Sequence, residues 1–315
     1  MKSSGGIRRV RSLPVKNEMK KYYFQYFAAL LLFGSNGLAA SFIHLPSDRI
    51  VLLRSVFGGA LLLALFLLSG QRPTAFRHGR DLFFLALSGT AMAADWLLLF
   101  EAYRQIGVSL GMLINYCGPV IVMALSPLVF RERVAWPKAI ALAAAMAGVF
   151  CVSGQAAAHG VNGRGLLCAG LSALSYAAMV ICNKKAARIE GMENAAIQML
   201  FALLAVAAVV GCRGGFSMAI TDSDWLPILW LGVVNTGVSC YFYFTAIGKL
   251  PVQTVAVCGY LEPLFAVLLS VLFLHESLRP VQILGAILIL GGAVLGECAS
   301  RKPRPIPCGT KRETA

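Results

Sequence analysis

Long apolar runs separated by short polar segments follow one another along the whole 315-residue chain. An apolar run of about 20 residues is long enough to cross the hydrocarbon core of a bilayer as a helix. The first run, at 22–43, is too long for the core of a signal peptide and predicts a retained membrane helix. The other expected spans lie near 50–70, 82–103, 107–130, 137–154, 165–183, 194–212, 225–247, 251–274 and 281–298. The pattern therefore predicts an all-α membrane protein with ten transmembrane helices.

One long segment of the second half of the chain has a counterpart in the first half. Residues 107–132 align without a gap on residues 251–276 when the numbering is shifted by 144 positions. The shift pairs tyrosine, proline and glutamate with their own kind: Tyr116 with Tyr260, Pro119 with Pro263, and Glu132 with Glu276. Since each half holds five expected helices, an odd number, the sequence predicts two inverted five-helix repeats.

The repeats set the expected domain boundaries. The expected order is a basic cytoplasmic tail (1–21), a first five-helix repeat (22–154), a polar linker (155–164), a second five-helix repeat (165–298) and a basic cytoplasmic tail (299–315). Ten crossings return the chain to the side on which it began, so both termini are expected in the cytoplasm.

The positions of lysine and arginine agree with this topology. With a cytoplasmic N-terminus, the inside loops and tails carry 22 of the 28 Lys and Arg residues, the outside loops carry five, and Arg54 stands within a helix. Cytoplasmic loops of membrane proteins are enriched in these two residues. The net charge of +14 is therefore a topology signal, and we expect no nucleic acid as a partner.

The composition also favours a membrane protein. The chain is 58% hydrophobic and 13% charged, with a mean hydropathy of +0.74, whereas soluble domains carry roughly 25% charged residues. Its nine cysteines stand singly, mostly within apolar runs, and show neither a disulfide framework nor the spacing of metal ligands. We expect no metal site and no cofactor.

Polar and aromatic side chains at a similar, central depth of several expected helices form a candidate substrate-binding site. The residues assigned to it are Asn36, Asp95, Trp96, Asn115, Tyr116, Tyr176, Asn235, Ser239, Tyr260 and Glu262. Any one Asn or Tyr is also explained by a hydrogen bond between helices, and the aromatic residues are explained by packing. Their convergence favours a cavity, and their chemistry suits neutral, zwitterionic or cationic metabolites such as amino acids.

Two prolines interrupt equivalent expected helices of the two halves. Pro119 leaves the carbonyl of Asn115 without its helical partner, and Pro263 does the same for Gly259, because proline has no N–H. A free carbonyl in hydrocarbon is costly unless it faces protein or a wet cavity. Interrupted segments at corresponding positions of two repeats point to a transporter's binding site. A bend that serves only packing is the alternative.

Two carboxylates stand near the middle of expected helices. An ionised carboxylate at this depth costs ~2.5–3.5 kcal/mol, so such a residue usually lines a pathway or has a partner. Burial disfavours the charged form, which makes Glu262 the first candidate for binding a proton or a substrate amine and Asp95 the second. A buried acid that only supports packing is the alternative. Arg54 lies near the outer end, at the depth of Glu101, and an outer-side ion pair is expected between these two.

The repeat and its motifs resemble the EamA-type drug/metabolite transporter superfamily. The residues that carry the resemblance are Tyr260, Leu261, Glu262, Pro263, Leu264, His275, Glu276, Gly285, Gly291 and Gly292 in the second half, and Asp95, Trp96, Tyr116, Pro119, Arg131, Glu132 and Gly148 in the first. The resemblance implies a ten-helix, multi-pass carrier of small metabolites in the inner membrane, often an exporter, with a central cavity between the halves. The implied partners are a small-molecule substrate, the lipid bilayer and, if transport is coupled, protons, while homodimer formation stays open.

Two other functional classes compete with a carrier. His275 and Glu276 begin like a zinc-protease motif but lack the second histidine, and the sequence holds no nucleophile elbow, P-loop or dinucleotide fingerprint. No enzyme is therefore expected. A membrane receptor or assembly subunit with the same fold is the alternative function, and substrate flux into vesicles separates it from a transporter.

Overall fold

The computed structural model describes residues 15–70, 73–118, 162–186, 188–189, 191–247, 259 and 261–299, with isolated positions between 121 and 151. The helices of the first half are α1 (Val15–Gly34), α2 (Asn36–Ser41), α3 (Ser47–Leu68), η1 (Ala75–Arg77), α4 (Gly79–Ile106) and α5 (Val108–Asn115). Those of the second half are α8 (Gly163–Lys185), α9 (Gly191–Cys212), α10 (Asp222–Leu229), η2 (Trp230–Val238), α11 (Ser239–Ile247), α13 (Leu261–Phe273) and α14 (Pro280–Ala299). The described residues contain no strand, in agreement with the all-α prediction.

Within the part of the chain that the structure describes, five stretches are long and apolar enough to cross a membrane. They are α3, α4, α8, α9 and the continuous stretch Asp222–Tyr243. Large apolar side chains cover the outside of the helices; examples are Leu67, Leu68, Phe83, Leu167, Leu226 and Ile287. Exposed apolar surface of this extent is rare on a protein in water. The chain is therefore a multi-pass membrane protein.

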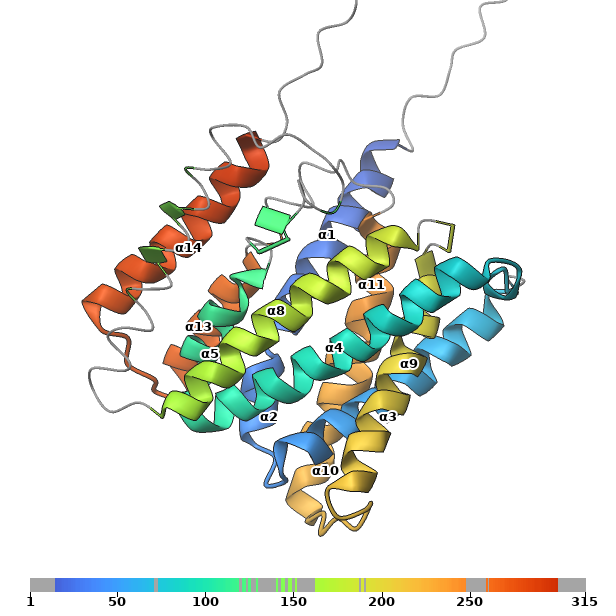
Figure 1. Ribbon diagram of the computed structural model, residues 1–315, viewed down its shortest axis with the longest axis horizontal. Helices are drawn as coiled ribbons and strands as arrows, with labels where there is room; N and C mark the ends of the chain where they lie inside the picture. The colour runs from blue at the N-terminus through green and yellow to red at the C-terminus, as the bar shows by residue number, and fades with distance from the viewer. Residues whose placement is uncertain are drawn as a thin grey trace, which may run out of the picture.

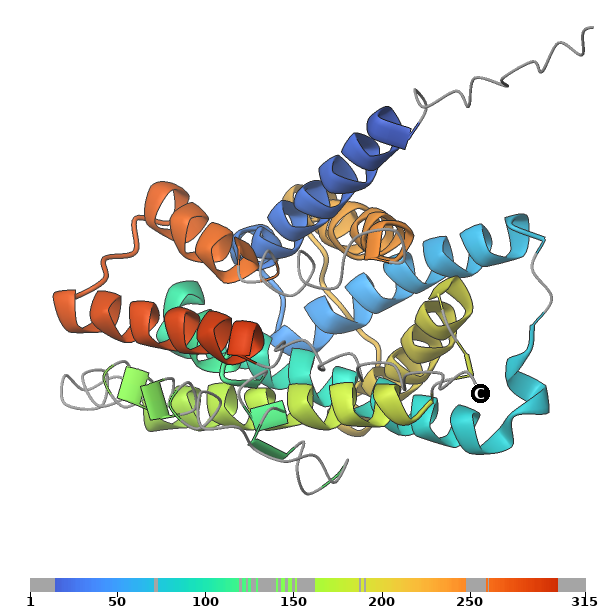
Figure 2. The ribbon, with the colours of Figure 1, turned by 90° about the horizontal axis from the view of Figure 1, so that it is seen from above.

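The helices pack around a polar centre. α4 runs along α8 and crosses α9, while α3 packs against α9 and η2 (Figures 1 and 2). α1 packs against α11 and α13, and α5 packs against α8 and α13. Glycine makes the closest approaches, because helices in lipid associate through close packing of small residues. A Cβ atom on Gly89 of α4 would lie 2.5 Å from the carbonyl oxygen of Gln198 in α9.

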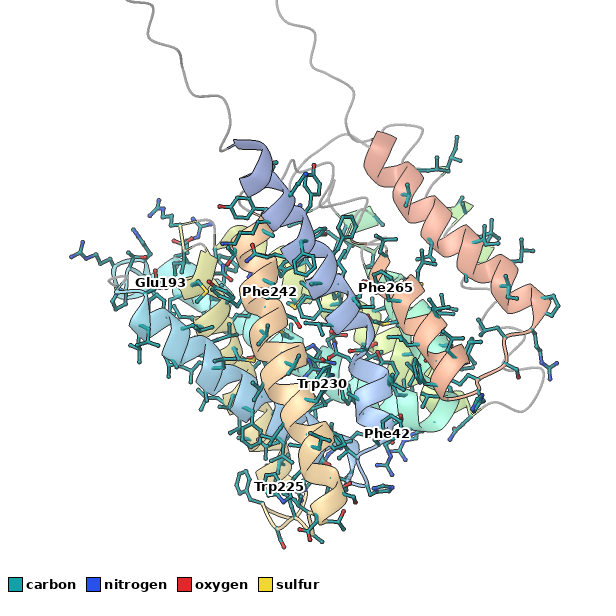
Figure 3. All side chains as sticks on the ribbon, turned by 180° about the vertical axis from the view of Figure 1, so that it is seen from behind. Phe42, Glu193, Trp225, Trp230, Phe242 and Phe265 are labelled. Atoms are coloured by element: carbon teal, nitrogen blue, oxygen red, sulfur yellow. The ribbon has the colours of Figure 1, made fainter. Side chains whose placement is uncertain are left out.

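Contacts between loops define two ends of the bundle. At the first end, the backbone N and the Nδ1 of His44 each lie 3.0 Å from Oδ1 of Asp224. At the second end, Glu193 accepts hydrogen bonds from the Thr74 hydroxyl and from the backbone N–H of Ala75, each at 2.7 Å. Figure 3 shows Trp225, next to Asp224, at the bottom of the molecule and Glu193 at the upper left. Each contact joins segments that the expected topology places on one side of the membrane.

Two expected helices differ in detail from the pattern of apolar residues. The first begins at Val15, before the apolar run, and is interrupted at Ser35, whose hydroxyl donates to the carbonyl of Leu32 at 2.8 Å. The eighth contains the π-helical stretch η2, in which the wider turn separates hydrogen-bonded residues by five positions. The spans expected at 107–130, 137–154 and 251–274 lie partly or largely outside the described residues.

Candidate functional site

Asp95 of α4 lies at the meeting point of three helices. Its side chain is only 4% exposed. The Nδ2 of Asn115, the last residue of α5, donates to Oδ1 of Asp95 at 2.8 Å and to the hydroxyl oxygen of Ser172 in α8 at 3.0 Å. The Ser172 hydroxyl in turn donates to the carbonyl of Ala169 at 2.8 Å. This buried network brings two of the expected site residues, Asp95 and Asn115, into direct contact.

Glu262 belongs to the first turn of α13 and faces α5. The hydroxyl of Tyr116, the residue that follows α5, donates a hydrogen bond to the Glu262 carboxylate. Gly34 at the end of α1 permits the close approach of α13 to α1. A Cβ at Gly34 would lie 2.9 Å from the carbonyl oxygen of Glu262 and 2.8 Å from Cβ of Phe265. Phe265 lies on α13 next to α1 in Figure 3. A carboxylate of the second half thus has its hydroxyl partner in the first half.

Asn235 and Asn36 contribute amide groups where η2 meets the break between α1 and α2. The Nδ2 of Asn235 donates to the Ser35 hydroxyl oxygen at 3.0 Å. The amide oxygens of both asparagines are buried and accept no hydrogen bond from the described residues. An unsatisfied buried acceptor costs about 1–3 kcal/mol. Two such acceptors are therefore available to a donor that enters the site.

Ser239 and Thr236 are fully buried, but their hydroxyls are already used. Ser239 donates to the carbonyl of Val234 at 2.9 Å, and Thr236 donates to the carbonyl of Leu231 at 2.8 Å. Both bonds span five residues, a spacing that the π-helical turn of η2 provides. Of the two, Thr236 also accepts a hydrogen bond, from the Nε of Arg54 in α3.

Arg54 of α3 lies inside the bundle with 3% of its surface exposed. Its guanidinium carbon is 4.1 Å from the ring centroid of Trp96 and 5.2 Å from that of Phe100, both in α4. Its Nε donates to the Thr236 hydroxyl oxygen at 3.3 Å. A cation over an aromatic face is stabilised by the ring quadrupole. Trp96, an expected site residue, therefore holds a cation of the protein itself.

The ion pair predicted between Arg54 and Glu101 does not form. Glu101 instead accepts hydrogen bonds from the hydroxyl of Ser47, at 2.9 Å, and from the side-chain amide of Gln105. The guanidinium of Arg54 lies against the rings of Trp96 and Phe100 instead, because its long side chain reaches away from its own Cα and gains cation–π contacts there. In this position the charge of Arg54 interacts with that of Asp95, although the two side chains form no direct ion pair.

The remaining expected residues are described only in part. Tyr176 of α8 packs on Gly118, where an added Cβ would lie 2.5 Å from its ring carbon Cδ1. Tyr260 and Pro119 lie outside the described residues, so their placement stays a prediction. Pro263 stands in the first turn of α13 as described, and α5 ends at Asn115 with a turn at Tyr116. Bends at the two prolines likewise stay predictions.

A cavity of about 270 Å³ opens beside this site near the first end of the bundle. Its lining comes from α2, α3, α4 and the start of α5: Gly37, Ala40, Ser41, Ile43, Ile50, Phe100, Tyr103, Arg104 and Val108. Phe100 also contacts Arg54. The cavity therefore shares one wall with the pocket around the guanidinium.

Three residues of the site were not assigned to it from the sequence: Ser35, Ser172 and Thr236. Ser172 lies one helical turn before Tyr176, on the same face of α8, and Ser35 and Thr236 are next to Asn36 and Asn235. These positions were therefore visible as neighbours of assigned residues. Short hydroxyl side chains are common in membrane helices, however, and a sequence does not show which of them bridge two helices.

Comparison with protein families gives a match over nearly the whole chain. The model of the EamA-like transporter family matches twice, at residues 20–154 and 163–296. Each match covers one of the two halves that the 144-residue shift relates. Both copies contribute to the buried polar groups, Asp95 and Asn115 from the first and Ser172 and Asn235 from the second.

Individual relatives are named as transporters. The uncharacterized transporter YxxF of Bacillus subtilis is 23% identical over 85% of this chain and 86% of its own length. The aromatic amino acid exporter YddG of Ancylobacter novellus is 31% identical, over 29% of this chain and 31% of its own length. Among solved structures, one crystal structure superposes with a TM-score of 0.63 at 21% identity, covering 89% of this chain and 99% of that chain, which shows a shared fold.

Proposed function

Because the chain belongs to the EamA-like transporter family, we propose that this membrane transporter is a secondary carrier that exports small neutral, zwitterionic or cationic metabolites, amino acids among them. It has ten transmembrane helices in two inverted repeats, residues 22–154 and 165–298, that flank a short linker. It resides in the inner membrane with both basic tails, 1–21 and 299–315, in the cytoplasm. The two matches to the family model and the loop contacts at each end of the bundle support this arrangement.

The buried polar centre carries the proposal. Asp95, Asn115 and Asn235 are buried inside a bundle whose outer surface is apolar, and they come from both repeats. Glu262 of the second repeat is partly buried. Polar groups at this depth are expensive and usually line a substrate or ion pathway. Free acceptors in this centre, the amide oxygens of Asn36 and Asn235, match the N–H donors of an ammonium group. The relative YddG, named as an aromatic amino acid exporter, supports amino acids as the first compounds to test.

Transport proceeds by alternating access, in which the two repeats rock around this centre. α5 and α13 belong to the expected helices 107–130 and 251–274, which the 144-residue shift relates, and they contact each other. Carriers with inverted repeats bind substrate where such corresponding segments meet. Glu262 is the coupling group, because its carboxylate binds either a proton or the substrate amine next to Tyr116. Asp95 is the second acidic group of the site. Tyr260, which lies outside the described residues, stays a predicted substrate-binding residue.

Flux through purified protein tests the function. The full chain is reconstituted into liposomes and supplied with a panel of labelled amino acids, amines and neutral metabolites, with and without a pH gradient. The proposal expects saturable flux of at least one zwitterionic or cationic compound above protein-free vesicles, with faster flux under the gradient. A receptor or assembly subunit of the same fold would show no flux for any compound.

A further inference from the structure

Arg54 is the only cation among the described residues at the polar centre, and no carboxylate of the described residues lies within ion-pair distance of it. Its guanidinium carries five N–H donors. Only Nε has an acceptor among the described groups, the Thr236 hydroxyl at 3.3 Å. The faces of Trp96 and Phe100 stabilise the charge but accept no in-plane hydrogen bond. Four donors of a nearly buried guanidinium are therefore unused.

A buried charge without a directly bound counter-ion is unfavourable, so a cation in this state is suited to receive an anion. The two carboxylates of the centre attract Arg54 from a distance but do not bind it directly. Asp95 accepts a hydrogen bond from Asn115, and Glu262 accepts one from Tyr116. The planar fork of a guanidinium matches a carboxylate through two parallel hydrogen bonds.

We propose that Arg54 is the specificity-determining residue of the transport site and that it binds a carboxylate of the substrate. The proposal rests on the proposed function and narrows its substrates to zwitterions that carry a free carboxylate, such as α-amino acids. Cationic amines without a carboxylate are then poor substrates, because an amine would leave Arg54 unpaired and bring a second positive charge close to it.

The surroundings of Arg54 fit a zwitterion. Thr236 of η2 accepts a hydrogen bond from the guanidinium. The preceding residue, Asn235, has an amide oxygen that accepts no hydrogen bond from the described residues. The amide oxygen of Asn36 is a second free acceptor. A carboxylate on Arg54 therefore leaves the ammonium group of the same molecule with neutral and acidic acceptors. The aromatic rings of Trp96 and Phe100 contact the guanidinium without using its N–H donors as in-plane hydrogen-bond partners.

Access to Arg54 leads past Phe100. This ring contacts the guanidinium and also lines the 270 Å³ cavity near the first end of the bundle. A substrate in this cavity therefore contacts a ring that also contacts the guanidinium. Tyr103 lines the same cavity, and its hydroxyl donates to the sulfur of Met112 at 3.4 Å.

Matched ligands test the requirement for a carboxylate without any mutation. L-Phenylalanine, L-phenylalaninamide and phenethylamine share the aromatic group and the amine, and only the first has a carboxylate. Binding to the detergent-purified full chain is measured by the shift in thermal unfolding and by the change in tryptophan fluorescence, since Trp96 lies on Arg54. We expect L-phenylalanine to bind at least about tenfold more tightly than the other two. Equal affinity for all three overturns the assignment.

Substitution of Arg54 then connects this preference to the residue. Arg54→Met is expected to weaken binding of L-phenylalanine at least about tenfold, with less than about threefold change for phenethylamine, and Arg54→Lys is expected to lie between it and the wild type. The control is Arg77→Met, an exposed arginine at the second end of the bundle, which should bind as the wild type does. If Arg54→Met does not fold, Arg54→Lys still has to reduce the preference for the carboxylate.

The outcomes separate the two proposals. Flux and binding that persist in Arg54→Met with an unchanged preference for the carboxylate overturn the role of Arg54 and leave the transport function standing. If the wild type neither binds nor transports any compound of the panel, the proposed function fails, and the role of Arg54 fails with it.

Discussion

Glu276 caps the helix that begins at Val108. Its two carboxylate oxygens accept hydrogen bonds from the backbone N–H groups of Val108 and Ser109, at 2.8 and 2.9 Å. These N–H groups start α5 and have no carbonyl partner within the helix, and a negative charge is favourable at this terminus. The carboxylate comes from the second half of the chain and the helix from the first. The contact therefore joins the two halves at the first end of the bundle.

This contact predicts a stability effect. Glu276→Gln keeps one acceptor but removes the charge, and Glu276→Ala removes both acceptors. A hydrogen bond to a charged group is worth about 1.5–3 kcal/mol, so we expect a lower melting temperature for both variants, with Ala the lower. Thermal unfolding in detergent measures it. The neighbouring exposed residue gives the control Ser277→Ala. An unchanged melting temperature for Glu276→Ala would show that the cap contributes nothing.

Substitution of Asp95 separates its charge from its hydrogen bond. Asp95→Asn retains an oxygen that can accept from Asn115, so the variant should fold with a melting temperature close to that of the wild type. It removes the negative charge that faces a substrate ammonium, so substrate affinity should fall about tenfold, equivalent to about 1.4 kcal/mol. Binding measured by tryptophan fluorescence checks this prediction, with Ser172→Ala as the control that keeps the charge. Wild-type affinity in Asp95→Asn would limit Asp95 to a role in packing.

Close packing of α4 on α9 predicts that Gly89 tolerates no side chain. An added Cβ would lie 2.5 Å from the backbone carbonyl oxygen of Gln198, which cannot move without moving α9. Gly89→Ala should therefore destabilise the protein by about 1–3 kcal/mol. Gly170 in α8 has nothing within 4 Å of an added Cβ, and Gly170→Ala should leave stability unchanged or raise it by up to ~1 kcal/mol. Equal melting temperatures for the two variants would contradict the packing described for α4 and α9.

The ten-helix topology predicts on which side of the membrane a fused reporter protein lies. A fusion at Gln155, in the linker between the repeats, should place its reporter on the outer side of the membrane, and a fusion at the C-terminus should place it in the cytoplasm. Five crossings separate the two positions. Alkaline phosphatase and fluorescent-protein fusions at both sites measure the sides directly. Reporters on the same side would exclude five helices in the second half.

The apolar pattern predicted well the helices that the structure describes most fully. The expected spans at 50–70, 82–103, 165–183 and 194–212 correspond to α3, α4, α8 and α9 within a few residues at each end. The physical reason is that a chain in lipid must satisfy its backbone internally, so an apolar run of sufficient length forms a helix whatever its neighbours are. The break at Ser35 was not predicted, because it depends on a hydroxyl that bonds its own helix and also meets Asn235.

The candidate site was predicted less completely. Counting residues along the expected helices placed Asp95 and Asn115 at a similar depth, and the two side chains are hydrogen-bonded in the structure. It failed for Arg54, because counting residues places the Cα atom but not the end of a long side chain. The two rings of Trp96 and Phe100 decide where that end lies, and they belong to another helix. Glu101 found local partners in Ser47 and Gln105, which a depth count does not reveal.

Transport by Glu262→Gln under a pH gradient tests whether this membrane protein is a proton-coupled carrier with Glu262 as its coupling group. Glutamine keeps the size of the side chain and an oxygen that accepts from Tyr116, but it cannot bind and release a proton. Vesicles with wild-type protein or the variant are compared for accumulation under a pH gradient and for exchange of substrate without one. We expect Glu262→Gln to fold and to retain substrate exchange, but to lose substrate accumulation under the pH gradient. Full gradient-driven accumulation by Glu262→Gln would show that Glu262 is not the coupling group.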